Sequence, residues 1–236
     1  MILRVVVLAA GTVLSYALAW QIGIPALVPA LNVLPALPFL YLSLRQGRTR
    51  RAIVEMLVWA ATLAAAATVI SYLDPVRSGR LFIHAEAYRR DMFFWVLTGI
   101  GAESDPAQFV PTQSMHAALF CALSYVSASL LSMPMGALLM NYMGHYVGAL
   151  AAVSRHQLLT AFAAWVPWAV IRIASFVVLG VVLAGPVSSR LLRFRFRLRD
   201  HLPELALALT GLLIDIVLKA ALAPHWHLLL RRLVGW

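Results

Sequence analysis

The sequence predicts an all-α fold: a polytopic transmembrane helix bundle of about seven spans with an interfacial amphipathic helix, forming one integral membrane domain over residues 1–236. Of its residues, 62% are hydrophobic and only 12% are charged, a composition typical of integral membrane proteins. Uncharged runs long enough for spanning helices alternate with short basic segments. The net charge of +10 therefore indicates membrane orientation rather than nucleic-acid binding, because these runs leave no soluble basic domain.

The uncharged runs divide into helices at their turn-forming residues. Val5 to Leu44 is long enough for two helices, with glycine and proline near its centre, and it exceeds the apolar core of a signal peptide. Residues 106–154 carry no charge and are broken by the sequence SMPMG at 132–136. The predicted spans cover residues 5–22, 27–44, 53–73, 114–131, 135–153, 158–183 and 203–222.

The most polar part of the chain is 74–111, and its mixed polar and aromatic character predicts an extracytoplasmic segment with an interfacial amphipathic helix. Pro203 and Glu204 are typical of a first helical turn, where proline loses no hydrogen bond and an acid meets the positive helix end.

The arginines predict the orientation of the bundle. If the loops at 45–51 and 190–199 share a side with Arg4, that side has ten arginines and the opposite side has seven, spread over longer segments. The positive-inside rule then places the N-terminus in the cytoplasm and the C-terminus outside. We expect a multi-pass protein of the cell inner (plasma) membrane.

The sequence RFRFRLR alternates with period two beside the predicted sixth span. Its cations Arg193, Arg195, Arg197 and Arg199 would meet anionic lipid, at about 1 kcal/mol per charge near the surface. Docking of a cytoplasmic partner is the alternative.

Three charged residues lie well inside predicted spans: Arg172 in the sixth, and Asp215 and Lys219 in the seventh. A charge in the bilayer normally faces the bundle and finds a partner. Arg172 and Asp215 both fall near the middle of antiparallel neighbours, so we expect an ion pair, with Lys219 one turn away on the same face. The pair would fix helix register; a proton or ion relay is less favoured, because one carboxylate faces two cations.

The fifth predicted span carries Asn141, Gly144, His145 and Gly148 on related faces. Glycines four apart allow close approach of another helix, so Asn141, Gly144 and Gly148 are predicted packing residues. No cofactor-binding motif occurs and Cys121 is the only cysteine, so we expect no cofactor and no metal.

Two enzyme classes remain as alternatives. A glutamate-type intramembrane protease of the CAAX-processing kind would use Glu86, Arg90, His116 and His145, with the carboxylate activating water. Against it, Ala149 stands where that class has asparagine. A lipid phosphatase is less favoured, since PTQSMH at 111–116 lacks a matching second histidine and basic cluster.

Three motifs in the last hundred residues are similar to those of the stage II sporulation protein M family of polytopic membrane proteins: NYMGHYVG (141–148), PWAVIRIAS (167–175) and LLIDIVLKAALAP (212–224). Where the family has glutamates, this chain has Arg172 and Asp215. The resemblance implies a noncatalytic component of a membrane complex, in some members one that acts in cell-envelope remodelling.

We therefore expect a non-catalytic structural or assembly subunit of a membrane complex. Its expected partners are membrane lipids and other membrane protein subunits, without nucleic acid. The rivals are the intramembrane hydrolase and a transporter or permease subunit.

Overall fold

The computed structural model describes residues 2–236, which form helices and no strand. The helices are α1 (Ile2–Ile22), η1 (Pro25–Leu27), α2 (Val28–Val33), α3 (Leu37–Arg45), α4 (Thr49–Leu73), α5 (Pro75–Leu81), α6 (Ala85–Thr98), α7 (Pro106–Val126), α8 (Ser132–Ala152), α9 (Gln157–Ala164), α10 (Pro167–Leu191), η2 (Leu198–His201) and α11 (Leu202–Val234).

Five segments are long and apolar enough to cross a membrane: Ile2–Ile22, Pro25–Arg45, Thr49–Leu73, Pro167–Leu191 and Leu198–Val234. The chain is accordingly an all-helical integral membrane protein. The remaining long helices, α7 and α8, have 21 residues each but carry polar side chains that lower their hydropathy. A count of seven spans thus remains a proposal.

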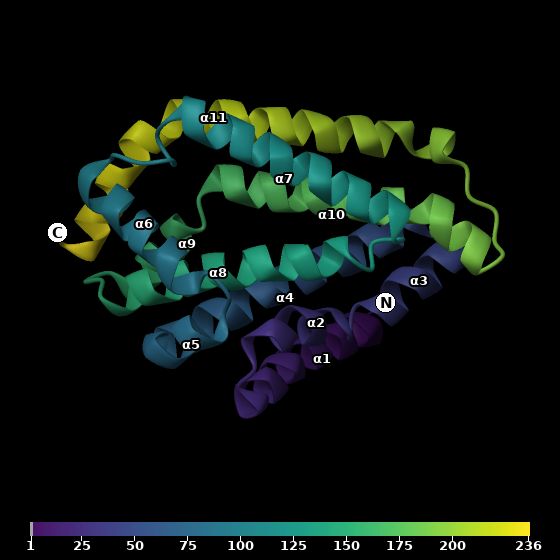
Figure 1. Cartoon of the computed structure of the whole chain (residues 1–236), viewed down its shortest axis with the longest axis horizontal. Coiled ribbons are helices and arrows are strands. Elements are labelled where there is room, and N and C mark those ends of the chain that lie inside the picture. Colours follow the sequence, from purple (N-terminus) through teal and green to yellow (C-terminus); the bar gives the residue numbers. More distant parts are fainter. Residues whose placement is uncertain (1) are drawn as a thin grey trace.

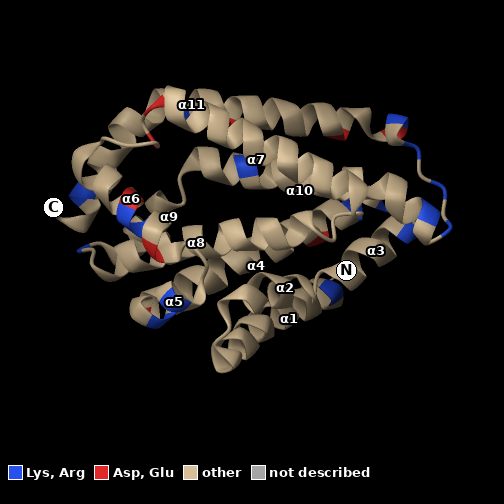
Figure 2. Cartoon of the chain, in the orientation of Figure 1, with Lys and Arg blue, Asp and Glu red and all other residues tan. Residues whose placement is uncertain are grey.

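The long helices run lengthwise through the molecule (Figure 1). On one side, α8 packs along α4, and α4 also contacts α1, α3 and α10; on the other, α10 packs against α7 and α11. In Figure 1, α7 and α8 meet at one end and diverge towards the other. Both arginine-rich loops lie at the end where α7 and α8 meet (Figure 2). Arg4 is close to the first of these loops, because it shares Glu55 as a partner with Arg51.

The predicted second span is interrupted by proline. Its helix begins as η1 and α2, ends at Val33, and resumes as α3 at Leu37. Pro35 lies in this break, where its ring and missing N–H oppose a continuous helix. The break lets the Trp59 indole N–H donate to the Asn32 backbone carbonyl oxygen at 2.9 Å.

The predicted sixth span, 158–183, is two helices. Val166 is extended (φ −55°, ψ 141°), because a residue before proline is disfavoured in the helical region, and Pro167 begins α10. Arg172 consequently lies in the second turn of α10, about 8 Å along its axis. The expectation that Arg172 sits at the centre of its helix is wrong.

The turn between the predicted fourth and fifth spans also differs. It occupies 127–131, and the SMPMG sequence forms the start of α8, where Pro134 leaves no hydrogen bond unmade. Ala128 and Ser129 have positive φ values of 53° and 68°. The Ser129 hydroxyl donates to the Gly180 carbonyl oxygen at 2.7 Å, which fixes this turn on α10.

The polar segment 74–111 contains two short helices, α5 and α6, and the start of α7. Beyond the predicted end of the last span, the helix continues through Pro224 to Val234. Figure 1 shows this C-terminal part of α11 bending towards α6 and α9, and α11 contacts both.

Candidate functional site

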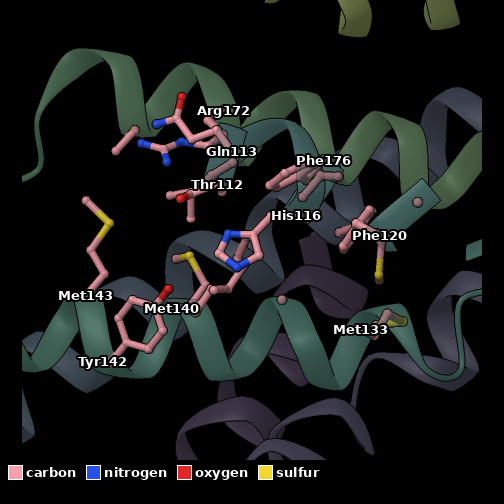
Figure 3. A pocket seen from close by; sticks show the side chains of 18 of the residues that line it. Thr112, Gln113, His116, Phe120, Met133, Met140, Tyr142, Met143, Arg172 and Phe176 are labelled. Carbon is pink, nitrogen blue, oxygen red and sulfur yellow. The ribbon is translucent and has the colours of Figure 1, made fainter. Parts of the chain in front are cut away.

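A partly open cavity of about 330 Å³ lies where α7 diverges from α8, and its walls come mainly from α7, α8 and α10, with further residues from α4. Its volume lies at the lower end of the range for small-molecule sites, roughly 300–1,000 Å³. Most of the lining is apolar, and the polar groups gather towards one end (Figure 3).

Figure 3 shows the two ends of this cavity. Arg172 of α10 and Tyr142 of α8 lie at one end, and His116 of α7 lies between them and the centre. Phe120 and Met133 lie at the other end, close to the α7–α8 turn. The cavity is therefore amphipathic along its length.

The structure brings Arg172 and Asp215 together. Arg172 Nε lies 3.3 Å from Asp215 Oδ2, and Asp215 is 1% exposed. Arg172 also borders a second cavity of about 360 Å³ between α7, α10 and α11, which Asp215 lines. The guanidinium thus stands between two cavities, with its carboxylate partner on the α11 side.

Lys219 does not join this pair. Its ammonium lies 3.0 Å from Glu103 Oε1 and 4.5 Å from the centre of the Phe109 ring. Glu103 belongs to the loop between α6 and α7, so this ion pair joins the loop to α11. The expected Arg172–Asp215 pair is thus joined by a second pair, Lys219 with Glu103. Sequence analysis missed Glu103 because the path of this loop is not encoded in local spacing.

Gln113 is a second residue that the sequence did not single out. It lies on α7 and lines both cavities, it is 8% exposed, and neither side-chain Nε2 nor Oε1 has a hydrogen-bond partner among residues 2–236. Buried amide groups are normally paired. The sequence offers no clear signal for it, because Gln113 is one of two glutamines in the polar first half of α7.

The four candidate protease residues are divided between two places. His116 lines the cavity between α7, α8 and α10, whereas His145 is fully buried with Nε2 3.4 Å from Glu86 Oε1. Arg90 is exposed, and Arg89 rather than Arg90 pairs with Glu86. The structure does not bring the four side chains to one cavity.

His145 is held by serines of neighbouring helices. Its Nδ1 lies 3.1 Å from the Ser78 hydroxyl of α5 and 3.3 Å from the Ser71 hydroxyl of α4. Ser78 is buried, and its hydroxyl donates a hydrogen bond to the Asp74 backbone carbonyl oxygen at 2.8 Å. This cluster joins α4, α5, α6 and α8.

Gly144 and Gly148 face α4. A Cβ atom on Gly144 would overlap the Ala67 side chain, and one on Gly148 would overlap the Thr68 carbonyl oxygen and approach the Tyr72 backbone nitrogen to 2.7 Å. Contacts with backbone cannot be relieved by a rotamer change. These two glycines set the spacing between α4 and α8.

Asn141 joins three helices. Its side-chain amide nitrogen donates to Asn32 Oδ1 at 3.0 Å, and its oxygen accepts from the Tyr16 hydroxyl. Asn32 in turn donates to the Ser15 hydroxyl at 3.0 Å. All four side chains are buried, so this network ties α8 to α1 and α2.

Glu55 is a buried charge that lies close to the arginine-rich end. It accepts hydrogen bonds from Arg4 Nε at 2.8 Å, Arg51 Nε at 3.0 Å and the Ser43 hydroxyl at 2.6 Å. Glu55 falls at the start of the predicted third span, 53–73, and its partners come from α1, α3 and α4. The cluster anchors α1 to α3 and α4.

The RFRFRLR segment (193–199) forms no strand: Arg193 lies in a turn with φ 55°, and the segment ends in η2, which begins at Leu198. Arg193, Arg195, Arg197 and Arg199 are exposed, while the intervening apolar residues are half-buried, and the Phe196 ring lies against Gly185 of α10. The alternation therefore places the arginines on the exposed side of the segment and the apolar residues on the side that packs against the bundle.

Comparisons with protein-family models, with curated proteins and with solved structures find no match.

Proposed function

We propose that this protein is a non-catalytic integral membrane protein of seven spans that acts as a structural or assembly subunit of a membrane complex. One observation carries the proposal: its deeply placed charges are paired across helices, Arg172 with Asp215 and Lys219 with Glu103. A charge removed from water requires such a partner. Paired in this way, the four side chains hold α10, α11 and the α6–α7 loop in place.

The separation of His116 from His145 favours this role over the protease. A general base must reach the water that it activates and the group that stabilises the oxyanion. We therefore expect Glu86→Gln and His116→Gln to complement a deletion strain as well as the unchanged protein does. Loss of function in both variants, with normal protein levels, would favour the hydrolase.

We further propose that the N-terminus and the arginine-rich end face the cytoplasm, with α7 and α8 as the fourth and fifth spans of the inner membrane. The positive-inside rule supports this orientation. Exposed Arg193, Arg195, Arg197 and Arg199 would then meet the anionic lipids of the cytoplasmic leaflet.

This orientation is tested with single cysteines in a Cys121→Ala background, which removes the only native cysteine. Gln46→Cys and Ala87→Cys both fall on exposed positions. On spheroplasts, a membrane-impermeant maleimide should label Ala87→Cys directly and Gln46→Cys only after permeabilisation. Direct labelling of Gln46→Cys, with Ala87→Cys labelled only after permeabilisation, would mean the opposite topology. Direct labelling of both variants would require an even number of spans between the two positions.

The complex itself is tested by extracting the protein from its membrane in polymer-bounded lipid particles, after brief cross-linking, and measuring the mass of the particle. We expect a second membrane protein at fixed stoichiometry. A particle that holds only this chain would contradict the subunit role.

A further inference from the structure

We propose that the cavity between α7, α8 and α10 binds a single-chain amphiphile with an anionic oxygen headgroup, a carboxylate or a phosphate. The headgroup would lie beside Arg172 and Gln113, and the chain would run towards Phe120 and Met133. This inference goes beyond the subunit role and does not depend on it.

Charge complementarity supports the anionic headgroup. The charged residues that line this cavity are Arg172, Lys219 and Glu103, and Lys219 is already paired with Glu103, so Arg172 is the cation available on this side. Asp215 lies on the lining of the other cavity. Arg172 approaches Asp215 through Nε. Within residues 2–236, no guanidinium nitrogen of Arg172 forms a hydrogen bond of ordinary geometry. Its two terminal nitrogens are placed to donate in parallel to a carboxylate or phosphate.

Gln113 is the second, independent observation. Its side chain is more than nine-tenths buried, borders the cavity, and has both polar atoms unpaired within the described chain. In Figure 3 it lies next to Arg172. Leaving such a group unpaired costs free energy, and a headgroup oxygen held by Arg172 would accept from Gln113 Nε2.

The apolar part of the cavity has room for a single acyl chain. Its apolar wall on α10 continues from Arg172 to Val181, about 14 Å along the helix axis. A volume of about 330 Å³ is small for a lipid with two chains, at the lower end of the usual range of ligand sites.

The polar end lies away from the arginine-rich end of the bundle, because α7 runs from the α6–α7 loop, which carries Glu103, towards the turn that it shares with α8. With the proposed orientation, the headgroup would lie in the outer half of the membrane with its chain directed inwards. Amphiphiles of the outer leaflet have this same orientation, with the headgroup outside and the acyl chain directed towards the membrane centre.

Photo-cross-linking in nanodiscs of neutral phospholipid tests this site, since single-chain detergents would compete for it. The probe is a long-chain fatty acid with a diazirine on its chain. We expect labelled peptides from α7, α8 and α10 at the apolar end of the cavity. Labelling confined to lipid-facing positions, such as Leu119 or Val170, would overturn the proposal.

Competitors separate the headgroup chemistries. Unlabelled oleate and lysophosphatidylglycerol carry a carboxylate and a phosphate, and the stronger competitor identifies which one the site prefers. Oleyl alcohol, with the same chain and no charge, should compete about tenfold or more weakly, the difference expected for a hydrogen bond to a charged group. Equal competition by the alcohol would overturn the anionic headgroup.

Variants locate the site. Gly136 lines the cavity, and a Cβ there meets only Phe120 at 3.7 Å, so Gly136→Leu should fill the chain region and abolish specific labelling. Ala118→Leu adds the same side chain at an exposed position of α7 and should leave labelling unchanged. Equal labelling in the two variants would contradict the proposal.

Headgroup variants complete the test. Gln113→Leu should weaken competition by oleate about threefold to tenfold through one lost hydrogen bond. The double variant Arg172→Gln with Asp215→Asn removes the cation without leaving a lone charge and should make oleate no better than oleyl alcohol. If both variants bind oleate as the unchanged protein does, the proposal fails, whether or not a partner subunit copurifies.

Discussion

Replacing Asp215 with alanine should destabilise the protein by about 3 kcal/mol, the lower end of the range for breaking a buried ion pair. Asp215 is 1% exposed and the Arg172 side chain is 24% exposed, so the cation that the substitution leaves behind is not completely enclosed by the protein. Thermal unfolding of the protein in neutral nanodiscs, followed by tryptophan fluorescence, measures the effect.

The control for this prediction is the double variant Arg172→Leu with Asp215→Leu. Removing both charges and restoring apolar volume should recover most of the lost stability, because the cost of one stranded charge disappears. A double variant that is no more stable than Asp215→Ala alone would show that the two side chains do not act as a pair.

Gly148→Ala should produce a loss of about 1–3 kcal/mol, the usual cost of overpacking a well-packed core. The added methyl would overlap the Thr68 carbonyl oxygen and lie 2.7 Å from the Tyr72 backbone nitrogen, and backbone atoms of α4 can yield only if the two helices separate. Because α4 and α8 form the central contact of the bundle, unfolding should begin at a lower temperature in the same fluorescence assay.

Gly136→Ala on the same helix is the matched control. Its methyl would meet the Phe120 ring at 3.7 Å, an ordinary van der Waals distance, and alanine favours helix over glycine by roughly 1 kcal/mol. Its stability should stay unchanged or rise slightly. A similar loss in both variants would mean that flexibility of α8, rather than its spacing from α4, explains the effect.

Much of the membrane architecture was predictable from composition and spacing alone. Long uncharged runs require helices, since a bilayer offers the backbone no other hydrogen-bond partners, and proline and glycine marked several of their ends. The pairing of Arg172 with Asp215 was predicted from two lone charges on consecutive antiparallel helices, and the structure places them 3.3 Å apart. The close approach at Gly144 and Gly148 was likewise expected from their spacing.

The errors have local causes. Pro167 ends one helix and begins another at a point that hydropathy alone does not reveal, so Arg172 was placed at a helix centre rather than in the second turn of α10. The SMPMG sequence was taken as a turn, although proline is equally suited to the first turn of a helix. The turn at Ala128 and Ser129 contains no glycine, so the sequence gives no signal for their positive φ values.

Sequence by itself determined that this chain is an all-helical membrane protein, where its arginines gather, and which intramembrane charges need partners. Those properties depend on hydrophobicity, charge and short-range spacing. Only the tertiary structure decided that Lys219 pairs with Glu103, that His116 and His145 lie in separate places, and that Gln113 and Arg172 share an amphipathic cavity. These relations join residues from distant helices and loops, and they depend on how those elements pack together, which no local pattern encodes.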